Sequence, residues 1–137
     1  MRSYYFAYGV NLEEHTMKDT YPSAEIYKFA VLKGFRLTFS GTDKGVCSIE
    51  PGGYKDYVEG LLYSVDHQEI EEPKKPSHRS NMDILTDNGE FVRAIVFYCT
   101  LEAYRTPSEE YLMRVFKKYQ DYGFNTKHIE RALELLL

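Results

Sequence analysis

The apolar segments of this chain are short, and residues that form turns separate them. Segments of this kind, bounded by glycine, proline or asparagine, are typical of strands rather than of long helices. Asp87-Asn88-Gly89 lies between two of them. Asn-Gly between two apolar runs is a strong signal for a β-hairpin. The chain is therefore predicted to form a sheet of many short strands.

The longest apolar segment, Ala24–Phe39, carries apolar residues mostly at every second position. Because the pattern breaks at Lys33-Gly34, it predicts either a long bent strand or a hairpin pair. Pro51-Gly52-Gly53 strongly predicts a turn between the next two strands. A short helical turn is expected over residues 66–72 and a loop over 73–77. The remaining strands are expected at residues 4–8, 45–49, 58–65, 79–85 and 91–100.

Two capping boxes, in which a capping residue precedes a glutamate by three positions, predict where helices begin. Asn11 and Glu14 form the first, before a short helix over residues 12–18. Thr106 and Glu109 form the second. The proline that follows Thr106 is then expected at the first helical position.

The helix after the second capping box presents an apolar stripe and ends at Gly123, which suits a C-terminal cap. A last helix is expected from residue 125 or 126 to 136. Strands early in the chain and helices at its end indicate an α+β fold. The prediction is one domain over residues 1–137, a small, mainly antiparallel β-barrel with a short N-terminal helix and one or two C-terminal helices.

Composition and charge disfavour several classes of partner. The 137 residues carry a net charge of −4, so no overall basic field attracts nucleic acid or an anionic membrane surface. No apolar stretch reaches the roughly 20 residues that span a bilayer. Met1-Arg2-Ser3 is not followed by the pattern of a signal peptide. We therefore expect a cytoplasmic protein with neither nucleic-acid nor membrane partners.

No metal or nucleotide motif is present in the sequence. Cys47 and Cys99 are 52 positions apart without further ligands at metal-binding spacing, and both are expected to be inert core thiols. The four histidines form no closely spaced pair. Phosphate-loop and dinucleotide-binding glycine patterns are missing. No metal and no cofactor are therefore expected.

Two segments have the residues for chemistry. Tyr8–Leu12 leads from a strand through Gly9 into a predicted helix start, where free backbone N–H groups can bind a carboxylate or phosphate. The alternative is a plain turn in which Asn11 only caps the helix. The second segment, Glu69–Pro73, carries three glutamates and provides a candidate general base. The alternative there is a solvated charged face.

The segment Tyr5-Phe6-Ala7-Tyr8-Gly9-Val10-Asn11-Leu12 resembles the opening signature Y-F-A-Y-G-S-N-L of the γ-glutamylcyclotransferase-like family. Further segments that follow in the order of the family are Pro22–Ala24, Leu32–Phe39, Gly45 with Pro51–Gly53, Val58–Tyr63, Val96–Tyr98, Pro107-Ser108 with Tyr111, and Gly123-Phe124. The resemblance covers nearly the whole chain.

The resemblance implies a mixed barrel with a cavity where the first loop meets the acidic loop. It further implies an enzyme without a cofactor that releases a γ-glutamyl group as 5-oxoproline, because the α-amine of the group attacks its own side-chain carbonyl. The implied substrate is a γ-glutamyl amino acid or a related amine. Carried over by position, the residues that bind it are Tyr8, Gly9, Val10, Asn11, Leu12, Tyr98 and Tyr111.

The general base implied by the resemblance is a glutamate followed by glycine. Here Glu72 is followed by Pro73, and Glu72 is the predicted base with Glu71 as the second choice. His78-Arg79 stand where an aromatic residue is usual, Val10 replaces the serine of the signature, and Lys118 stands in place of a glycine.

These departures support an alternative of another class, a non-catalytic protein that binds a small ligand or a partner on the same fold. The alternative is favoured if Glu72 points to solvent and no other carboxylate enters the cavity. The resemblance also assigns different positions to some of the 13 tyrosines. Tyr5, Tyr63 and Tyr119 are expected to pack in the core, whereas Tyr8, Tyr98 and Tyr111 are expected in the cavity. The sequence leaves the oligomeric state open.

Overall fold

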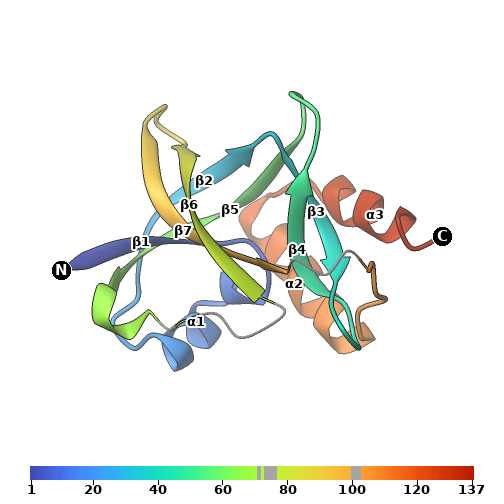
Figure 1. The fold of residues 1–137 in the computed structure, drawn as a ribbon, viewed down its shortest axis with the longest axis horizontal. Helices are drawn as coiled ribbons and strands as arrows, with labels where there is room; N and C mark the ends of the chain where they lie inside the picture. The colour runs from blue at the N-terminus through green and yellow to red at the C-terminus, as the bar shows by residue number, and fades with distance from the viewer. Residues whose placement is uncertain (71, 73–76, 100–102) are drawn as a thin grey trace.

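The computed structural model describes residues 1–70, 72, 77–99 and 103–137. Short helical elements follow β1 and β5, and two longer helices end the chain (Figure 1). The strands are β1 (Arg2–Ala7), β2 (Glu25–Lys33), β3 (Phe35–Ser40), β4 (Val46–Pro51), β5 (Tyr57–Asp66), β6 (Ser77–Thr86) and β7 (Phe91–Cys99). The helices are η1 (Val10–Leu12), α1 (Glu14–Thr20), η2 (His67–Glu69), α2 (Glu109–Tyr122) and α3 (Lys127–Glu134), of which η1 and η2 are single 3₁₀ turns.

Five strands close into a barrel in the order β1-β5-β2-β6-β7. Neighbouring strands are antiparallel except β1 and β7, which meet in parallel at Tyr5 and Ile95 and complete the ring. Strands β3 and β4 form a separate two-stranded sheet. This sheet lies beside α2 and α3 (Figure 1). The predicted α+β fold with a small mixed barrel is confirmed.

The stretch Ala24–Phe39 is a bent pair of strands that belong to different sheets. Strand β2 pairs with β5 in the barrel, whereas β3 pairs with β4, so of the two predicted alternatives the hairpin pair is wrong. The bend occurs at Gly34, as the sequence indicated, and its φ of 83° lies in the region that glycine adopts without strain. Because the chain bends here, one continuous apolar segment contributes to two sheets.

Strand β5 is at the centre of the hydrophobic core. It pairs with β1 on one side and with β2 on the other. Its apolar side chains from Val58 to Val65 are buried. Gly60 allows β1 to come very close. A Cβ at Gly60 would lie 2.3 Å from the carbonyl oxygen of Ala7 and 2.8 Å from the ring of Phe6.

Both predicted capping boxes are wrong in detail. Helix α1 begins at Glu14 without a side-chain cap, and the amide of Asn11 donates instead to the hydroxyl of Tyr5 at 3.1 Å. At the start of α2 the cap is Ser108, whose hydroxyl accepts from the backbone N–H of Tyr111. Tertiary contacts thus decide which polar side chain caps each helix, and sequence spacing alone does not contain them.

Other local expectations are closer to the structure. Gly123 ends α2 in the left-handed conformation with φ of 72°, as predicted. The Asn88-Gly89 turn joins β6 to β7. The helical turn expected over 66–72 is shorter, because β5 continues to Asp66 and η2 spans only His67–Glu69.

Gly60→Ala tests the close approach of β1 and β5. The new methyl group overlaps backbone as well as a ring, so we expect the free energy of unfolding to fall by about 2–4 kcal/mol. Urea denaturation of both proteins measures the change. Gly53→Ala is the matched control, because its Cβ would meet no atom closer than 3.7 Å. Equal effects of the two substitutions would contradict the packing described for Gly60.

Candidate functional site

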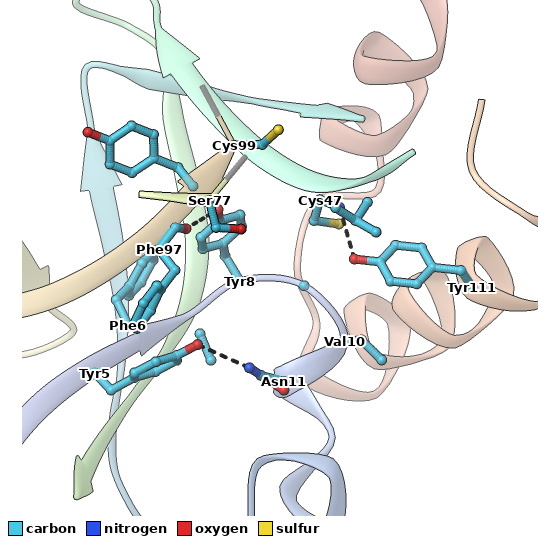
Figure 2. Close-up of a pocket in the computed structure, with 14 residues that line it drawn as sticks. Tyr5, Phe6, Tyr8, Val10, Asn11, Cys47, Ser77, Phe97, Cys99 and Tyr111 are labelled. Atoms are coloured by element: carbon cyan, nitrogen blue, oxygen red, sulfur yellow. Dashed lines mark hydrogen bonds between the residues drawn. The ribbon is translucent and has the colours of Figure 1, made fainter. Parts of the chain in front are cut away.

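A cavity of about 220 Å³ opens at the end of β1, where the chain enters η1. Strands β4 and β7 and the start of α2 form its other walls (Figure 2). Most of its lining is aromatic or aliphatic. The lining residues are Tyr5, Phe6, Ala7, Tyr8, Gly9, Val10, Asn11, Val46, Cys47, Ser77, Phe97, Tyr98, Cys99 and Tyr111.

The first loop, which we define as residues Gly9–Glu13, contributes to the cavity lining two adjacent residues whose backbone N–H groups have no partner among the described residues. Its 3₁₀ turn is closed by the N–H of Leu12 on the carbonyl of Gly9 at 2.9 Å and by the N–H of Glu13 on that of Val10 at 3.0 Å. The N–H groups of Val10 and Asn11 precede these bonds and donate to no residue that the structure describes. Two adjacent N–H groups of this kind suit an anionic oxygen.

Gly9 is packed against Cys47 and Tyr111. A Cβ at Gly9 would lie 2.8 Å from the Cβ of Cys47 and 3.3 Å from the hydroxyl oxygen of Tyr111. That hydroxyl accepts the backbone N–H of Cys47 at 2.8 Å (Figure 2). Glycine is therefore required here for close packing, and β4, α2 and the first loop meet at one point.

Burial keeps several titratable side chains of the cavity lining in their neutral form. Burial raises the pKa of Tyr8 and of Tyr111 far above the usual value for tyrosine. Burial also raises the pKa of the Cys47 thiol to about 12, so this thiol stays protonated and weakly nucleophilic. The hydroxyl of Tyr8 donates to the carbonyl of Phe97 at 2.5 Å. The cavity thus offers hydrogen bonds, and its described lining includes no Asp, Glu, Lys, Arg or His.

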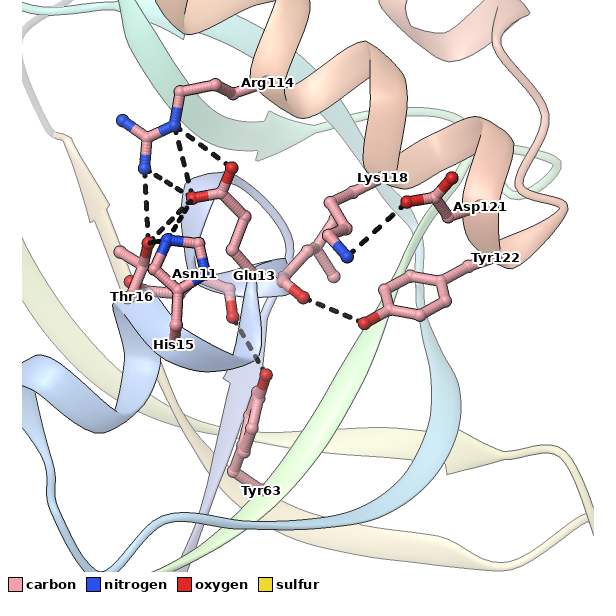
Figure 3. Close-up of polar contacts among 10 residues, drawn as sticks. Asn11, Glu13, His15, Thr16, Tyr63, Arg114, Lys118, Asp121 and Tyr122 are labelled. Atoms are coloured by element: carbon pink, nitrogen blue, oxygen red, sulfur yellow. Dashed lines mark hydrogen bonds and ion pairs between the residues drawn. The ribbon is translucent and has the colours of Figure 1, made fainter.

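The last residue of the first loop, Glu13, is held by helix α2. Its carboxylate accepts bonds from Arg114 at 2.5, 3.1 and 3.2 Å and from the hydroxyl of Thr16 at 2.7 Å (Figure 3). The side chain of Glu13 is only 10% exposed, and that of Arg114 is 38% exposed. The hydrogen bonds from Arg114 lower the pKa of Glu13 from its ordinary value of 4.5 to about 2.

Two tyrosines hold the carbonyl groups of the first loop. The hydroxyl of Tyr63 on β5 donates to the carbonyl of Asn11 at 3.1 Å, and that of Tyr122 on α2 donates to the carbonyl of Leu12 at 3.0 Å (Figure 3). The sequence assigned Tyr63 to packing only and gave no role to Tyr122, Glu13 or Arg114. The available signal is helical spacing, since Arg114 and Tyr122 lie three and eleven positions after Tyr111 and so share a side of the helix with it.

Most residues predicted for substrate binding lie at the cavity. Tyr8, Gly9, Val10, Asn11, Tyr98 and Tyr111 line it, whereas Leu12 is fully buried in the core behind it. Tyr5, which was expected only to pack, also lines the cavity. Its hydroxyl accepts from Asn11, so it supports the first loop from inside the barrel.

The predicted base Glu72 lies away from the cavity in this structure. Its side chain is 84% exposed and pairs with Arg79 at 3.2 Å. No glutamate or aspartate is among the described residues that line the cavity. Glu71, the second choice, and Pro73 lie outside the described residues. Ser77, which lines the cavity, comes five positions after Glu72.

No three His, Cys, Asp or Glu side chains in the described ranges lie close enough together to hold a metal ion. No helix in the same ranges is both long and apolar enough to span a membrane.

Solved structures identify the fold. A protein named gamma-glutamyl cyclotransferase superposes with a TM-score of 0.82 at 19% identity over 96% of this chain and 86% of that one. The chain has the γ-glutamylcyclotransferase-like fold. The human uncharacterized protein loc79017 gives the same TM-score and coverage at 22% identity. YkqA from Bacillus subtilis gives 0.72 at 18% identity, over 97% of this chain and 53% of that one.

No protein-family model and no curated protein sequence matches the chain. The likeness to proteins of the γ-glutamylcyclotransferase-like fold is therefore carried by the tertiary structure. It agrees with the resemblance noted in the segment from Tyr5 to Leu12.

Arg114→Met tests the ion pair that holds the first loop. Near neutral pH we expect it to lower the free energy of unfolding by about 1–2 kcal/mol, a value reduced because Arg114 is partly exposed. The pKa of Glu13 is lower in the folded state, so the stabilisation is complete above about pH 4.5 and is lost as the pH falls through about 2. Urea denaturation at several pH values in this window measures it.

The control is Lys117→Met on the same helix. Lys117 pairs with Asp121 at 3.2 Å, but its side chain is 71% exposed. We expect a change below about 0.5 kcal/mol. An Arg114→Met effect that does not shrink on acidification would contradict the role of the Glu13 carboxylate.

Proposed function

We propose that this protein is a γ-glutamylcyclotransferase-like enzyme that releases 5-oxoproline from a γ-glutamyl amino acid or amine. The observation that carries the proposal is the pair of free N–H groups at Val10 and Asn11, two residues that line a largely apolar cavity. Its support from outside the chain is the fold, which is shared with a protein named gamma-glutamyl cyclotransferase. The cavity suits a small molecule, since it is concave and largely apolar with a few polar groups.

In this proposal the carboxylate of the γ-glutamyl group binds the N–H groups of Val10 and Asn11. Tyr8, Tyr98 and Tyr111 surround the rest of the group, and their rings exclude water from it. Binding in a confined space folds the γ-glutamyl chain so that its α-amine lies close to its own side-chain carbonyl. Such proximity makes the intramolecular attack efficient.

The proposed reaction forms one bond and breaks another. The α-amine nitrogen attacks the γ-carbonyl carbon and loses a proton to a base, and the bond from that carbon to the departing amine then breaks. The departing amine takes a proton as it leaves, so the products are 5-oxoproline and the free amine. A glutamate carboxylate accepts and returns this proton, which is general acid–base catalysis.

Glu72 is the proposed base, with Glu71 as the second choice. For Glu72 to act, its carboxylate must leave Arg79 and turn toward the first loop. The Glu72–Arg79 ion pair is exposed on the glutamate side, and exposed pairs contribute about 0–1 kcal/mol, so breaking it costs little.

The exposed position of Glu72 favours a second function. In it the protein binds a small carboxylate compound without catalysis. Glu72 points to solvent, and no carboxylate among the described residues lines the cavity. A protein of this kind would keep the N–H groups and the tyrosines and would lack a base at the reacting amine.

The test is incubation of the protein with a panel of γ-glutamyl amino acids and γ-glutamyl amines, with 5-oxoproline measured by mass spectrometry. We expect release from at least one member. Glu72→Gln should lower kcat by at least about a hundredfold with unchanged circular dichroism, because the amide cannot accept the proton.

Glu71→Gln examines the second choice in the same assay. Glu90→Gln is the matched control, since Glu90 lies in the exposed β6–β7 turn and should leave activity unchanged. Full activity in both Glu72→Gln and Glu71→Gln would overturn the assignment of the base. Saturable binding of the panel without any 5-oxoproline would favour the second function.

A further inference from the structure

We propose that Tyr122 and Arg114 on helix α2 are positioning residues, which hold the two N–H groups of the first loop in the orientation that binds a ligand carboxylate. The inference rests on the carboxylate binding at Val10 and Asn11 proposed above, and it does not depend on catalysis. It assigns a ligand-binding role to one face of α2.

The planar peptide groups of the first loop link each N–H to the carbonyl of the preceding residue. The free N–H of Val10 shares a plane with the carbonyl of Gly9, and that of Asn11 shares a plane with the carbonyl of Val10. Leu12 and Glu13 bond to these two carbonyls through their own N–H groups. The direction of both free donors is therefore set by the peptide groups of Leu12 and Glu13.

Tyr122 holds one of these peptide groups at its other end. The carbonyl of Leu12 lies in the same plane as the N–H of Glu13, and it accepts the hydroxyl of Tyr122 at 3.0 Å (Figure 3). The ring of Tyr122 is itself fixed between Phe29, Phe124 and the ammonium of Lys118, which lies 5.3 Å from the ring centre. A rotation of this peptide group would break the bond to Tyr122.

Arg114 holds the loop one residue further on. Its guanidinium binds both carboxylate oxygens of Glu13, and one of its nitrogens also donates to Thr16 at 3.2 Å. Tyr63 acts in the same way from the barrel, on the carbonyl of Asn11. The loop is thus fixed between β5 and α2, and α2 contributes two of its side-chain anchors, Tyr122 and Arg114.

Arg114 and Tyr122 lie on the same face of α2 as Tyr111, which lines the cavity. A helix is rigid over this length, so a single element sets both a wall of the cavity and the anchors of the loop. Because the first loop is already ordered before a ligand binds, less conformational entropy is lost on binding. Removing an anchor should therefore weaken carboxylate binding without changing the lining of the cavity.

The test measures the binding of L-glutamate, which carries the carboxylate of the γ-glutamyl group, by ¹⁵N NMR. In the wild type, the amide signals of Val10 and Asn11 should shift on titration and give a Kd. Tyr122→Phe removes one hydroxyl and keeps the ring, and we expect its Kd to rise about threefold to tenfold, as for the loss of one hydrogen bond. Arg114→Met should raise the Kd by about tenfold or more.

Two measurements distinguish a positioning role of Tyr122 and Arg114 from a general loss of stability. Arg114→Lys keeps the charge without the planar fork and should recover part of the affinity lost in Arg114→Met. In the 5-oxoproline assay, Tyr122→Phe should raise KM with kcat within about twofold of wild type, because the variant leaves the reacting groups untouched. Tyr54→Phe and Arg93→Met, on exposed side chains of the β4–β5 loop and β7, are controls that should match the wild type.

The outcomes separate this inference from the proposed function. Shifts at Val10 and Asn11 with weaker binding in both α2 variants, but no 5-oxoproline from any substrate, would support the inference and overturn catalysis. A wild-type Kd in Tyr122→Phe and Arg114→Met would overturn the inference alone. The absence of glutamate binding in the wild type would overturn the inference and the proposed carboxylate site together.

Discussion

The ion pair between Glu13 and Arg114 joins the two parts of the molecule on which the site depends. Glu13 ends the first loop, which continues β1 of the barrel, and Arg114 belongs to α2, which packs outside it. Because Glu13 is nearly buried, its charge needs this partner. With the loop fixed, β1 and α2 enclose one cavity, and β4 completes the wall through Cys47.

Close packing has opposite consequences in the barrel and in the first loop. In the barrel, β5 buries apolar side chains along most of its length, and Gly60 lets β1 approach until only hydrogen would fit. In the loop, the same close packing at Gly9 leaves two N–H groups without a described partner. Unpaired donors beside an apolar cavity are costly in an empty site and favourable once an anion binds.

Sequence reasoning found the cavity residues better than it found their supports. Tyr8 and Gly9 were predicted from the opening segment Tyr5–Leu12 and Tyr111 from the later match at Pro107-Ser108, and each of the three lines the cavity. Asn11 was predicted as a helix cap, yet its amide binds the hydroxyl of Tyr5, because a buried hydroxyl nearby competes with the helix end. The sequence could not predict that the Glu72 carboxylate points to solvent and pairs with Arg79, since the direction of a carboxylate depends on its surroundings.

The sequence by itself determined the strands, the turns at Gly34 and Gly89 and the end of α2 at Gly123, because these depend on local backbone preferences and on apolar periodicity. The tertiary structure alone decided that β2 and β3 enter different sheets and that Arg114 and Tyr122 meet the first loop. Such contacts join residues about a hundred positions apart in the chain. No local pattern encodes them, since each arises only when the whole barrel has closed and α2 has packed against it.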